Sequence, residues 1–253
     1  MDKTIYQRCR AAWKQRSRGV MAALLGSLLV GAATLFWKLA EQIDRGLTRP
    51  WDERILLALR RADDPAIPIG PHWLHEAGLD VTALGSPIVL AIFVVASVGF
   101  LYFEGQRRVA AVTAAMTIGG GLLSVLLKSI FARPRPEVVP HLRDVLSSSF
   151  PSGHTMGAAI VYMTLGVMFM KSFRSRRAQA FCLLLALFLT VAVGLSRVYL
   201  GVHYPSDVLG GWLAALSWTL ACWSLAHFIP NRPLPEVDDA PTKPSQADRS
   251  LPE

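Results

Sequence analysis

The amino-acid sequence predicts an all-α membrane protein that crosses the bilayer six times. Its 253 residues are 52% hydrophobic and only 17% charged, and the mean hydropathy is +0.37, which is too apolar for an ordinary water-soluble domain. Several apolar stretches are long enough to cross the hydrocarbon core of a bilayer. The net charge of +8 does not indicate nucleic-acid binding, because the basic residues lie beside apolar stretches and do not form one continuous face.

Six candidate spans follow from a hydropathy window of about 19 residues. They cover residues 19–39, 83–103, 109–127, 155–170, 178–195 and 208–228. The fourth is short, and part of the turn before it would bring it to spanning length. The first follows a basic segment, as a signal peptide would, but its apolar run is longer than a signal core and no small-x-small cleavage site follows. We therefore expect an uncleaved helix there.

Basic residues set the expected orientation of the spans. They precede the first span and fill the loops after the second and the fourth, so both termini are expected in the cytoplasm. The chain then divides into a basic segment (1–18), a membrane domain (19–229) and a polar, proline-rich tail (230–253) that we expect to be disordered and cytoplasmic. In the first outer loop, about 41–80, residues 51–61 form an amphipathic pattern. It predicts a helix in the membrane interface, which either borders a lipid entrance or simply packs on the bundle.

The first of three polar segments is KSIFARPRP, at 128–136, where the third span ends. Its prolines prevent a regular helix, so the loop can turn Arg135 back toward Lys128. An ammonium and a guanidinium neutralise a phosphate in complementary ways. Taken alone, the two cations could equally be charges at a membrane boundary. We interpret Arg133, in the same loop, as a structural or interfacial charge.

The second segment is PSGH, at 151–154, where the fourth helix is expected to begin. A helix N-terminus offers unpaired backbone N–H groups to an anion, and Gly153 lets the backbone approach it closely. Ser152 can add a hydroxyl donor, and His154 is placed to exchange a proton with a leaving group. The alternative is a capped helix start in which Gly153 and Gly157 serve helix packing.

The third segment is SRVYLGVHYPSD, at 196–207, and it is the most specific of the three. His203 and Asp207 are four residues apart, and Pro205 between them marks an expected helix start. If the turn is helix-like, Asp207 can accept a hydrogen bond from one ring nitrogen of His203, which leaves the other nitrogen free to attack phosphorus. Arg197 adds a third cation. A structural His–Asp pair is the alternative for this segment alone, but all three segments are expected on one side of the membrane.

Taken together, the pattern K-x6-RP, PSGH and SR-x5-H-x3-D resembles the signature of the type 2 phosphatidic acid phosphatase (PAP2) superfamily, which includes vanadium haloperoxidases. The resemblance covers residues 82–228 and implies a helical bundle, a bacterial inner-membrane phosphatase that needs no metal or cofactor, and a phosphohistidine intermediate. The basic loops place the expected active site on the extracytoplasmic face. It implies that His203 is the nucleophile, Asp207 its orienting group and His154 the general acid. It also implies that the phosphoryl oxygens are held by Lys128, Arg135, Ser152, Gly153 and Arg197.

Other functions remain open from the sequence alone. A metal-dependent hydrolase could use His154, His203 and Asp207 as ligands, although the three cations disfavour a divalent metal there. A haloperoxidase would share the anion site, a transporter would need ionisable groups nearer the bilayer midplane, and a lipid-to-lipid phosphotransferase would differ only in the acceptor. The expected substrate is a phospholipid or polyprenyl phosphate, with undecaprenyl diphosphate, phosphatidylglycerol phosphate, phosphatidic acid and lipid A as candidates. We expect activity to fall on both sides of an optimum pH.

Overall fold

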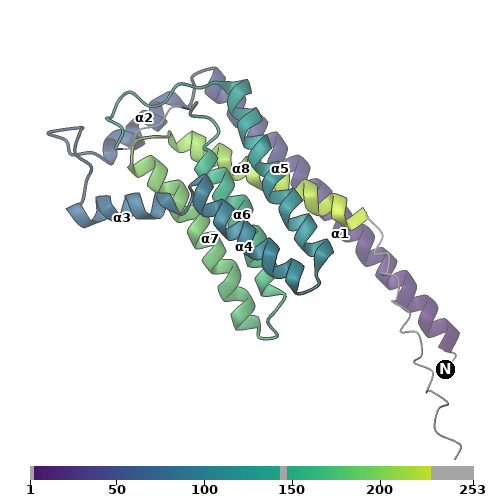
Figure 1. Cartoon of the computed structure of the whole chain (residues 1–253). Coiled ribbons are helices and arrows are strands. Elements are labelled where there is room, and N and C mark those ends of the chain that lie inside the picture. Colours follow the sequence, from purple (N-terminus) through teal and green to yellow (C-terminus); the bar gives the residue numbers. More distant parts are fainter. Residues whose placement is uncertain (1–2, 143–146, 229–253) are drawn as a thin grey trace, which may run out of the picture.

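The computed structural model describes residues 3–142 and 147–228, and their side chains between residues 19 and 225. Within these residues the chain forms α-helices and no strand, which confirms the all-α prediction (Figure 1). The predicted tail, 230–253, lies outside the described residues. The helices are α1 (Lys3–Asp44), α2 (Arg49–Ala58), α3 (His72–Ala83), α4 (Pro87–Phe103), α5 (Arg107–Phe131), α6 (Gly153–Met170), α7 (Arg176–Tyr199) and α8 (Pro205–Phe228).

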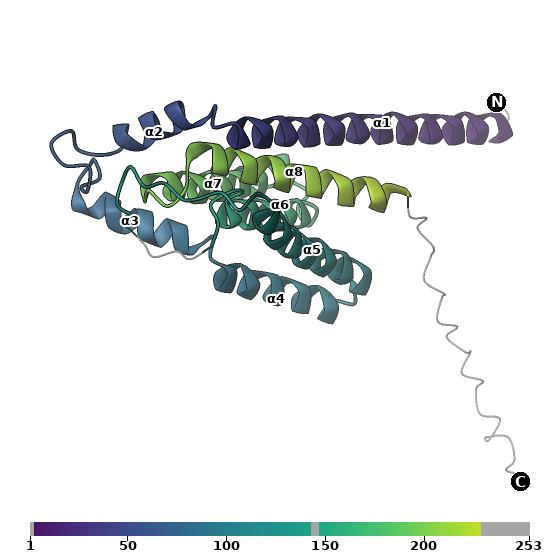
Figure 2. The ribbon, with the colours of Figure 1, turned by 90° about the horizontal axis from the view of Figure 1, so that it is seen from above.

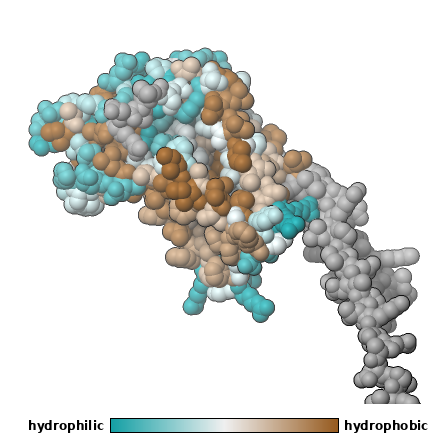
Figure 3. All heavy atoms as spheres, viewed as in Figure 1, coloured by the Kyte–Doolittle hydropathy of each residue, from teal (hydrophilic) through white to brown (hydrophobic). Residues whose placement is uncertain are grey.

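Five of these helices are long and apolar enough to cross a membrane: α1 from Gly19 onward, α5, α6, α7 and α8. Helices α3 and α4 pass the same test together, although they are bent by 48° at the break between them. The protein is therefore a multi-pass membrane protein, with five or six candidate spans among the residues that the structure describes. Figure 3 shows the corresponding surface, in which apolar residues cover the body of the bundle and hydrophilic residues gather at its two ends.

The second span differs most from the sequence prediction. We expected a helix from residue 83, but the chain breaks after Ala83 and restarts at Pro87, where the Ser86 hydroxyl accepts a hydrogen bond from the Val89 N–H at 3.4 Å. Helix α3, which precedes the break, was not predicted. Its residues are only moderately apolar, and it packs against α7, so tertiary contact rather than local pattern accounts for it.

A helix is present where the amphipathic pattern at 51–61 predicts one, with shifted ends. Helix α2 starts at Arg49, with Pro50 in its first turn, and ends at Ala58, three residues before the predicted end. Its Leu56 is fully buried, whereas Ile55 is 40% exposed. The helix thus has one face against the protein and one face outward, and it contacts the start of α8.

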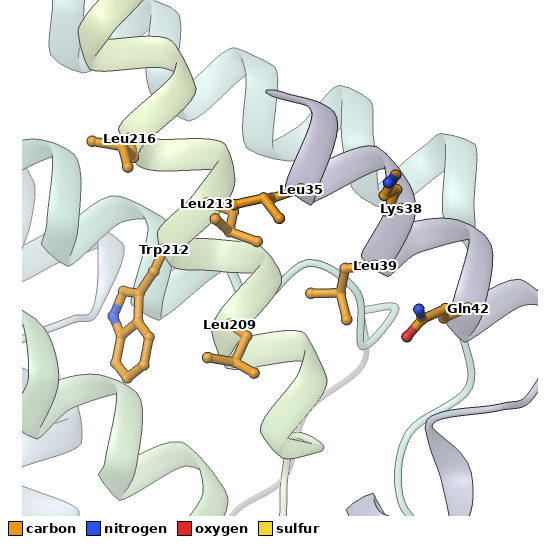
Figure 4. A pocket seen from close by; sticks show the side chains of 8 residues that line it. All are labelled: Leu35, Lys38, Leu39, Gln42, Leu209, Trp212, Leu213 and Leu216. Atoms are coloured by element: carbon orange, nitrogen blue, oxygen red, sulfur yellow. The ribbon is translucent and has the colours of Figure 1, made fainter. Parts of the chain in front are cut away.

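Helix α6 forms the centre of the bundle, in contact with α4, α5, α7 and α8. Small buried side chains such as Ala158 and Ala159 allow these close approaches. Helix α1 lies outside the others and runs along α8 (Figure 2). Figure 4 shows the groove between α1 and α8, about 470 Å³ in volume and lined mainly by leucines from both helices. Such a surface suits hydrocarbon chains better than water.

The order of the helices brings the three polar segments together. Helices α5 and α7 end, and α6 and α8 begin, at the same end of the bundle, where α2 also lies (Figure 1). The short α4–α5 and α6–α7 turns lie at the opposite end. A site that is scattered over 80 residues of sequence is therefore gathered at one end of the bundle.

Candidate active site

The start of α8 places Asp207 by local hydrogen bonding. Pro205 is the first helical residue, as predicted, and Asp207 lies in the first turn. One carboxylate oxygen, Oδ2, accepts a hydrogen bond from the backbone N–H of Tyr204 at 2.9 Å. An acidic side chain that caps the N–H groups at the start of its own helix is a common stabilising device, and it also suits the helix dipole. The carboxylate is thus fixed in position before any contact with His203.

The ring of His203 is buried, and its neighbours define which nitrogen carries the proton. Arg135 Nη1 lies 3.3 Å from Nε2, and because a guanidinium can only donate, Nε2 must be the bare nitrogen. The proton therefore sits on Nδ1, which lies 3.3 Å from the Ser149 hydroxyl oxygen. The pKa of His203 is lowered to about 3, mainly by burial and to a lesser extent by the charges of Arg197 and Arg135, against the opposing effect of Asp207. The neutral ring holds its lone pair toward Arg135.

Ser149 links this ring to Asp207 in a way that the sequence did not suggest. The predicted direct hydrogen bond is absent from this geometry, because His203 Nδ1 and Asp207 Oδ2 are 3.6 Å apart. The Ser149 hydroxyl donates to the same Oδ2 and so connects the two groups. Ser149 is fully buried, and its backbone N–H donates to the Arg133 carbonyl at 2.8 Å. Its position two residues before the PSGH segment was the only available signal.

Two of the predicted cations hold neighbouring carbonyls of the loop before α6. Lys128 Nζ donates to the Ser148 carbonyl, and Arg135 Nε donates to the Ser147 carbonyl at 2.7 Å. Arg135 Nη1 also donates to the carbonyl of Val202, next to His203. Burial lowers the pKa of the Arg135 guanidinium, but an arginine stays charged at any physiological pH. Lys128 and Arg135 thus converge on one loop, as the proline-punctuated segment predicted.

The PSGH segment starts a helix, as predicted, with Gly153 as the first residue of α6. A Cβ atom at Gly153 would lie 3.2 Å from Lys128 Cε, so the glycine gives the lysine side chain room beside the helix N-terminus. Ser152 is fully buried, and its backbone N–H donates to the Asp207 carbonyl at 3.1 Å. His154 follows in the first turn and is only partly buried. The helix N-terminus therefore joins both Lys128 and the first turn of α8.

Arg197 lies in the last turn of α7 and is fully buried. Its Nη1 donates to the hydroxyl of Thr82 at 2.9 Å. Thr82 belongs to α3, the helix that the sequence did not predict, so this helix helps to hold a candidate phosphate ligand. Since the charge of Arg197 lowers the pKa of His203, the two side chains act on each other electrostatically.

Arg133, for which the sequence allowed either a structural or an interfacial role, lies next to the site. Its side chain is only 11% exposed and forms ion pairs with Asp52 of α2, at 3.0 Å, and with Asp207. The guanidinium also stacks over the Tyr204 ring, 4.3 Å from the centroid. These contacts support the structural interpretation of Arg133 and not the interfacial one.

Comparison with known proteins identifies the arrangement. A family model described as the PAP2 superfamily matches residues 108–230. The chain is 34% identical over 167 residues to phosphatidylglycerophosphatase B of Bacillus subtilis, a match that covers 63% of this chain and 80% of that protein. The chain belongs to the PAP2 superfamily. As a PAP2 protein, it is a phosphoric ester hydrolase of the membrane lipid phosphatase kind.

Other relatives are named for different lipid substrates. The chain is 32% identical over 125 residues to undecaprenyl-diphosphatase BcrC of Bacillus subtilis, covering 46% of this chain and 58% of that one. It is also 32% identical over 111 residues to a lipid A 1-phosphatase of Rhizobium etli, covering 38% and 44%. The fold matches a crystal structure of a transmembrane PAP2-type phosphatidylglycerolphosphate phosphatase from Bacillus subtilis. That match has a TM-score of 0.71 and 29% identity, and it covers 80% of this chain and 98% of the other.

Proposed function

We propose that this PAP2 protein removes a phosphate from a membrane lipid through a phosphohistidine on His203, without a metal ion. The observation that carries the proposal is the pair of contacts made by the His203 ring: Nε2 faces the Arg135 guanidinium, and Nδ1 faces the Ser149 hydroxyl, which together imply an unprotonated Nε2. A phosphoryl group drawn to the guanidinium of Arg135 would meet the lone pair of Nε2. This is the arrangement that nucleophilic attack on phosphorus requires.

The proposed reaction has two steps. In the first, Nε2 of His203 forms a bond to phosphorus while the bond from phosphorus to the lipid oxygen breaks, and His154 gives that oxygen a proton. In the second, His154 takes a proton from water, whose oxygen displaces Nε2 and releases inorganic phosphate. In both steps the charge on the phosphoryl oxygens is stabilised by Lys128, Arg135, Arg197, the Ser152 hydroxyl and the Gly153 N–H.

A metal-dependent alternative would need Asp207 as a ligand. Both of its carboxylate oxygens are already engaged, Oδ1 by Arg133 and Oδ2 by Ser149 and the Tyr204 N–H. We therefore expect phosphate release to continue in EDTA and to be inhibited by vanadate, a phosphate mimic. Loss of activity in EDTA that returns with a divalent cation would contradict the metal-free mechanism.

An apolar hollow beside the site supports a lipid as the substrate. It has a volume of about 700 Å³ and lies among α2, α3, α7 and α8. Tyr199 and Pro205, which close α7 and open α8, both line it, and His203 lies in the turn between them. Trp51, Ile55 and Trp212 supply large apolar surfaces there. A hydrocarbon chain in this hollow would leave its headgroup at the level of His203.

The substrate is best identified with the purified protein and a panel of lipids. The panel contains phosphatidylglycerol phosphate, phosphatidic acid, undecaprenyl diphosphate and lipid A. Phosphatidylglycerol phosphate is expected to react fastest, because the matches to the two proteins named for it cover 80% and 98% of those proteins. His203→Ala should lower phosphate release by roughly 10³-fold or more. Normal turnover in a folded His203→Ala protein would remove the proposed nucleophile. Loss of the lipid phosphate without free phosphate would indicate transfer to another lipid.

We also propose that both termini lie in the cytoplasm of a bacterium and that the site faces away from it. The basic residues among positions 3–18, in the first part of α1, and those at or beside the α4–α5 and α6–α7 turns support this orientation, because such residues are retained on the cytoplasmic side. Single cysteines placed at Gln106 and at Asp63 can be tested with a membrane-impermeant thiol reagent in intact cells, in a background without the natural cysteines. We expect the reagent to label the cysteine at position 63 and not the one at position 106. Labelling at position 106 alone would show that the orientation is the opposite of the proposed one.

A further inference from the structure

The buried carboxylate of Asp52 is an unusual feature of a helix from the outer loop. Asp52 is 0% exposed. Its Oδ1 accepts a hydrogen bond from the Ser206 backbone N–H at 2.9 Å, and its Oδ2 accepts from the Ser206 hydroxyl and from Arg133 Nη2, the latter at 3.0 Å. A buried carboxylate is costly unless it is paired in this way. Asp52 therefore ties α2 to the first turn of α8, one residue before Asp207.

Arg133 connects this carboxylate to the catalytic one. Its Nη2 faces Asp52, and its Nη1 donates to Asp207 Oδ1 and to the Ser206 hydroxyl, the latter at 2.8 Å. Its contacts differ from those of Arg135, which bind Ser147, Val202 and Nε2 of His203. Arg133 thus lies behind Asp207, on the side away from the nitrogen that meets phosphate.

The charges of this group have a consequence for the reaction. Arg133 is shared between two carboxylates, so it neutralises Asp207 only in part. When Nε2 of His203 bonds to phosphorus, the ring gains positive charge, and the remaining negative charge on Asp207 favours that change. If Asp52 were neutral, Arg133 would pair with Asp207 alone, and less negative charge would face the ring.

We propose that Asp52 and Arg133 form a positioning pair that sets the orientation and effective charge of Asp207, and that α2 thereby belongs to the catalytic apparatus. The pair acts through Asp207 and does not touch the phosphate. This inference rests on the proposed function of His203 as nucleophile. It assigns to the first outer loop a part in the rate of the reaction, in addition to any part in lipid binding.

The test compares two neighbouring acids on α2. Asp52→Asn should lower kcat by about 10- to 100-fold, as loss of a residue that orients a catalytic group commonly does. KM for the lipid and the inhibition constant of inorganic phosphate should stay within about twofold, because the phosphate ligands are untouched. Glu53→Gln is the matched control, since Glu53 lies next in the chain and pairs with Arg49 at 2.7 Å on the more exposed face. It should behave like the unaltered protein.

A second variant, at Arg133, separates a positioning role from a folding role. Arg133→Lys keeps the charge but cannot bridge two carboxylates with the same geometry, so it should also lower kcat at unchanged KM. If Asp52→Asn does not fold, the kcat of Arg133→Lys tests the positioning role instead. An unchanged kcat in the folded variants, or a fall that only follows the folded fraction, would overturn the inference. If the unaltered protein releases no phosphate from any lipid of the panel, the proposed function itself has failed.

Discussion

The end of the bundle that carries the site and the helical body below it are stabilised in opposite ways. At the site end, ionisable groups are buried: Asp52, Arg197, His203 and Asp207 are each at most 1% exposed. The body instead turns large apolar side chains outward, such as Phe103 at 87% exposure, and packs small residues inside. A change at the site end leaves a buried charge without its partner, whereas a change in the body alters only packing. Activity and stability should therefore respond to different sets of residues.

The largest effect should come from a cation of the site end. Arg135→Gln removes the guanidinium that faces His203 Nε2 and should lower kcat/KM by roughly 10²- to 10³-fold, as expected for loss of a group that stabilises transition-state charge. Initial rates of phosphate release measure this. Arg61→Gln is the control, because Arg61 pairs at the surface with Asp63. Equal losses in both variants would mean that general surface charge, and not the site, governs the rate.

A smaller effect should follow from removal of the hydroxyl between His203 and Asp207. In Ser149→Ala, His203 Nδ1 loses its acceptor, while Asp207 Oδ2 keeps the Tyr204 N–H. We expect kcat to fall about 10-fold, the cost of one lost hydrogen bond of about 1.4 kcal/mol. Ser129→Ala is the matched control, because the Ser129 hydroxyl donates to the Leu126 carbonyl in its own helix. No change in Ser149→Ala would show that Asp207 acts on the ring without the bridge.

A change in the helical body should lower stability and leave activity unchanged. A Cβ atom at Gly119 would lie 2.6 Å from Trp218 Cζ2, so Gly119→Val forces the indole to shift. The free energy of unfolding should fall by about 1–3 kcal/mol, while kcat of the folded protein stays the same. Gly121→Val is the control on the same helix, because its added atoms meet open space. Thermal unfolding in detergent and specific activity test both, and lost activity without lost stability would break the distinction between the two regions.

The smallest effect concerns pH. Because burial lowers the pKa of His203 to about 3, its neutral form persists well below the usual range. The rate of phosphoenzyme formation in a single turnover should therefore not fall between about pH 7 and pH 5, whereas a histidine of ordinary pKa would become roughly 30-fold less available. The same shift costs stability in acid: from about pH 6.5 toward pH 3 the unfolded chain binds a proton that the folded site does not. A steep acid loss of the single-turnover rate would show an exposed ring.

The sequence predicted the fold and most residues of the candidate site for physical reasons. Long apolar runs indicate spans directly, and the helix starts at Gly153 and Pro205 follow from local chain chemistry. Helix α3 was missed because its stability comes from packing against α7. Ser149 and Asp52 were missed because neither a serine in a polar loop nor an aspartate on a short amphipathic helix has a sequence pattern that reveals burial. Their roles depend on contacts with residues far along the chain, which only the folded structure brings together.

The length of α1 has a consequence of its own. Its 42 residues measure about 63 Å at 1.5 Å per residue, roughly twice the hydrocarbon thickness of a bilayer. Since α1 is held along α8, it cannot tilt freely to hide the excess length, and Figure 2 shows it running past the end of α8. The C-terminal end of α1 is therefore fixed beside the site. The excess length of the helix lies at its N-terminal end and exceeds what the hydrocarbon core of a bilayer can hold.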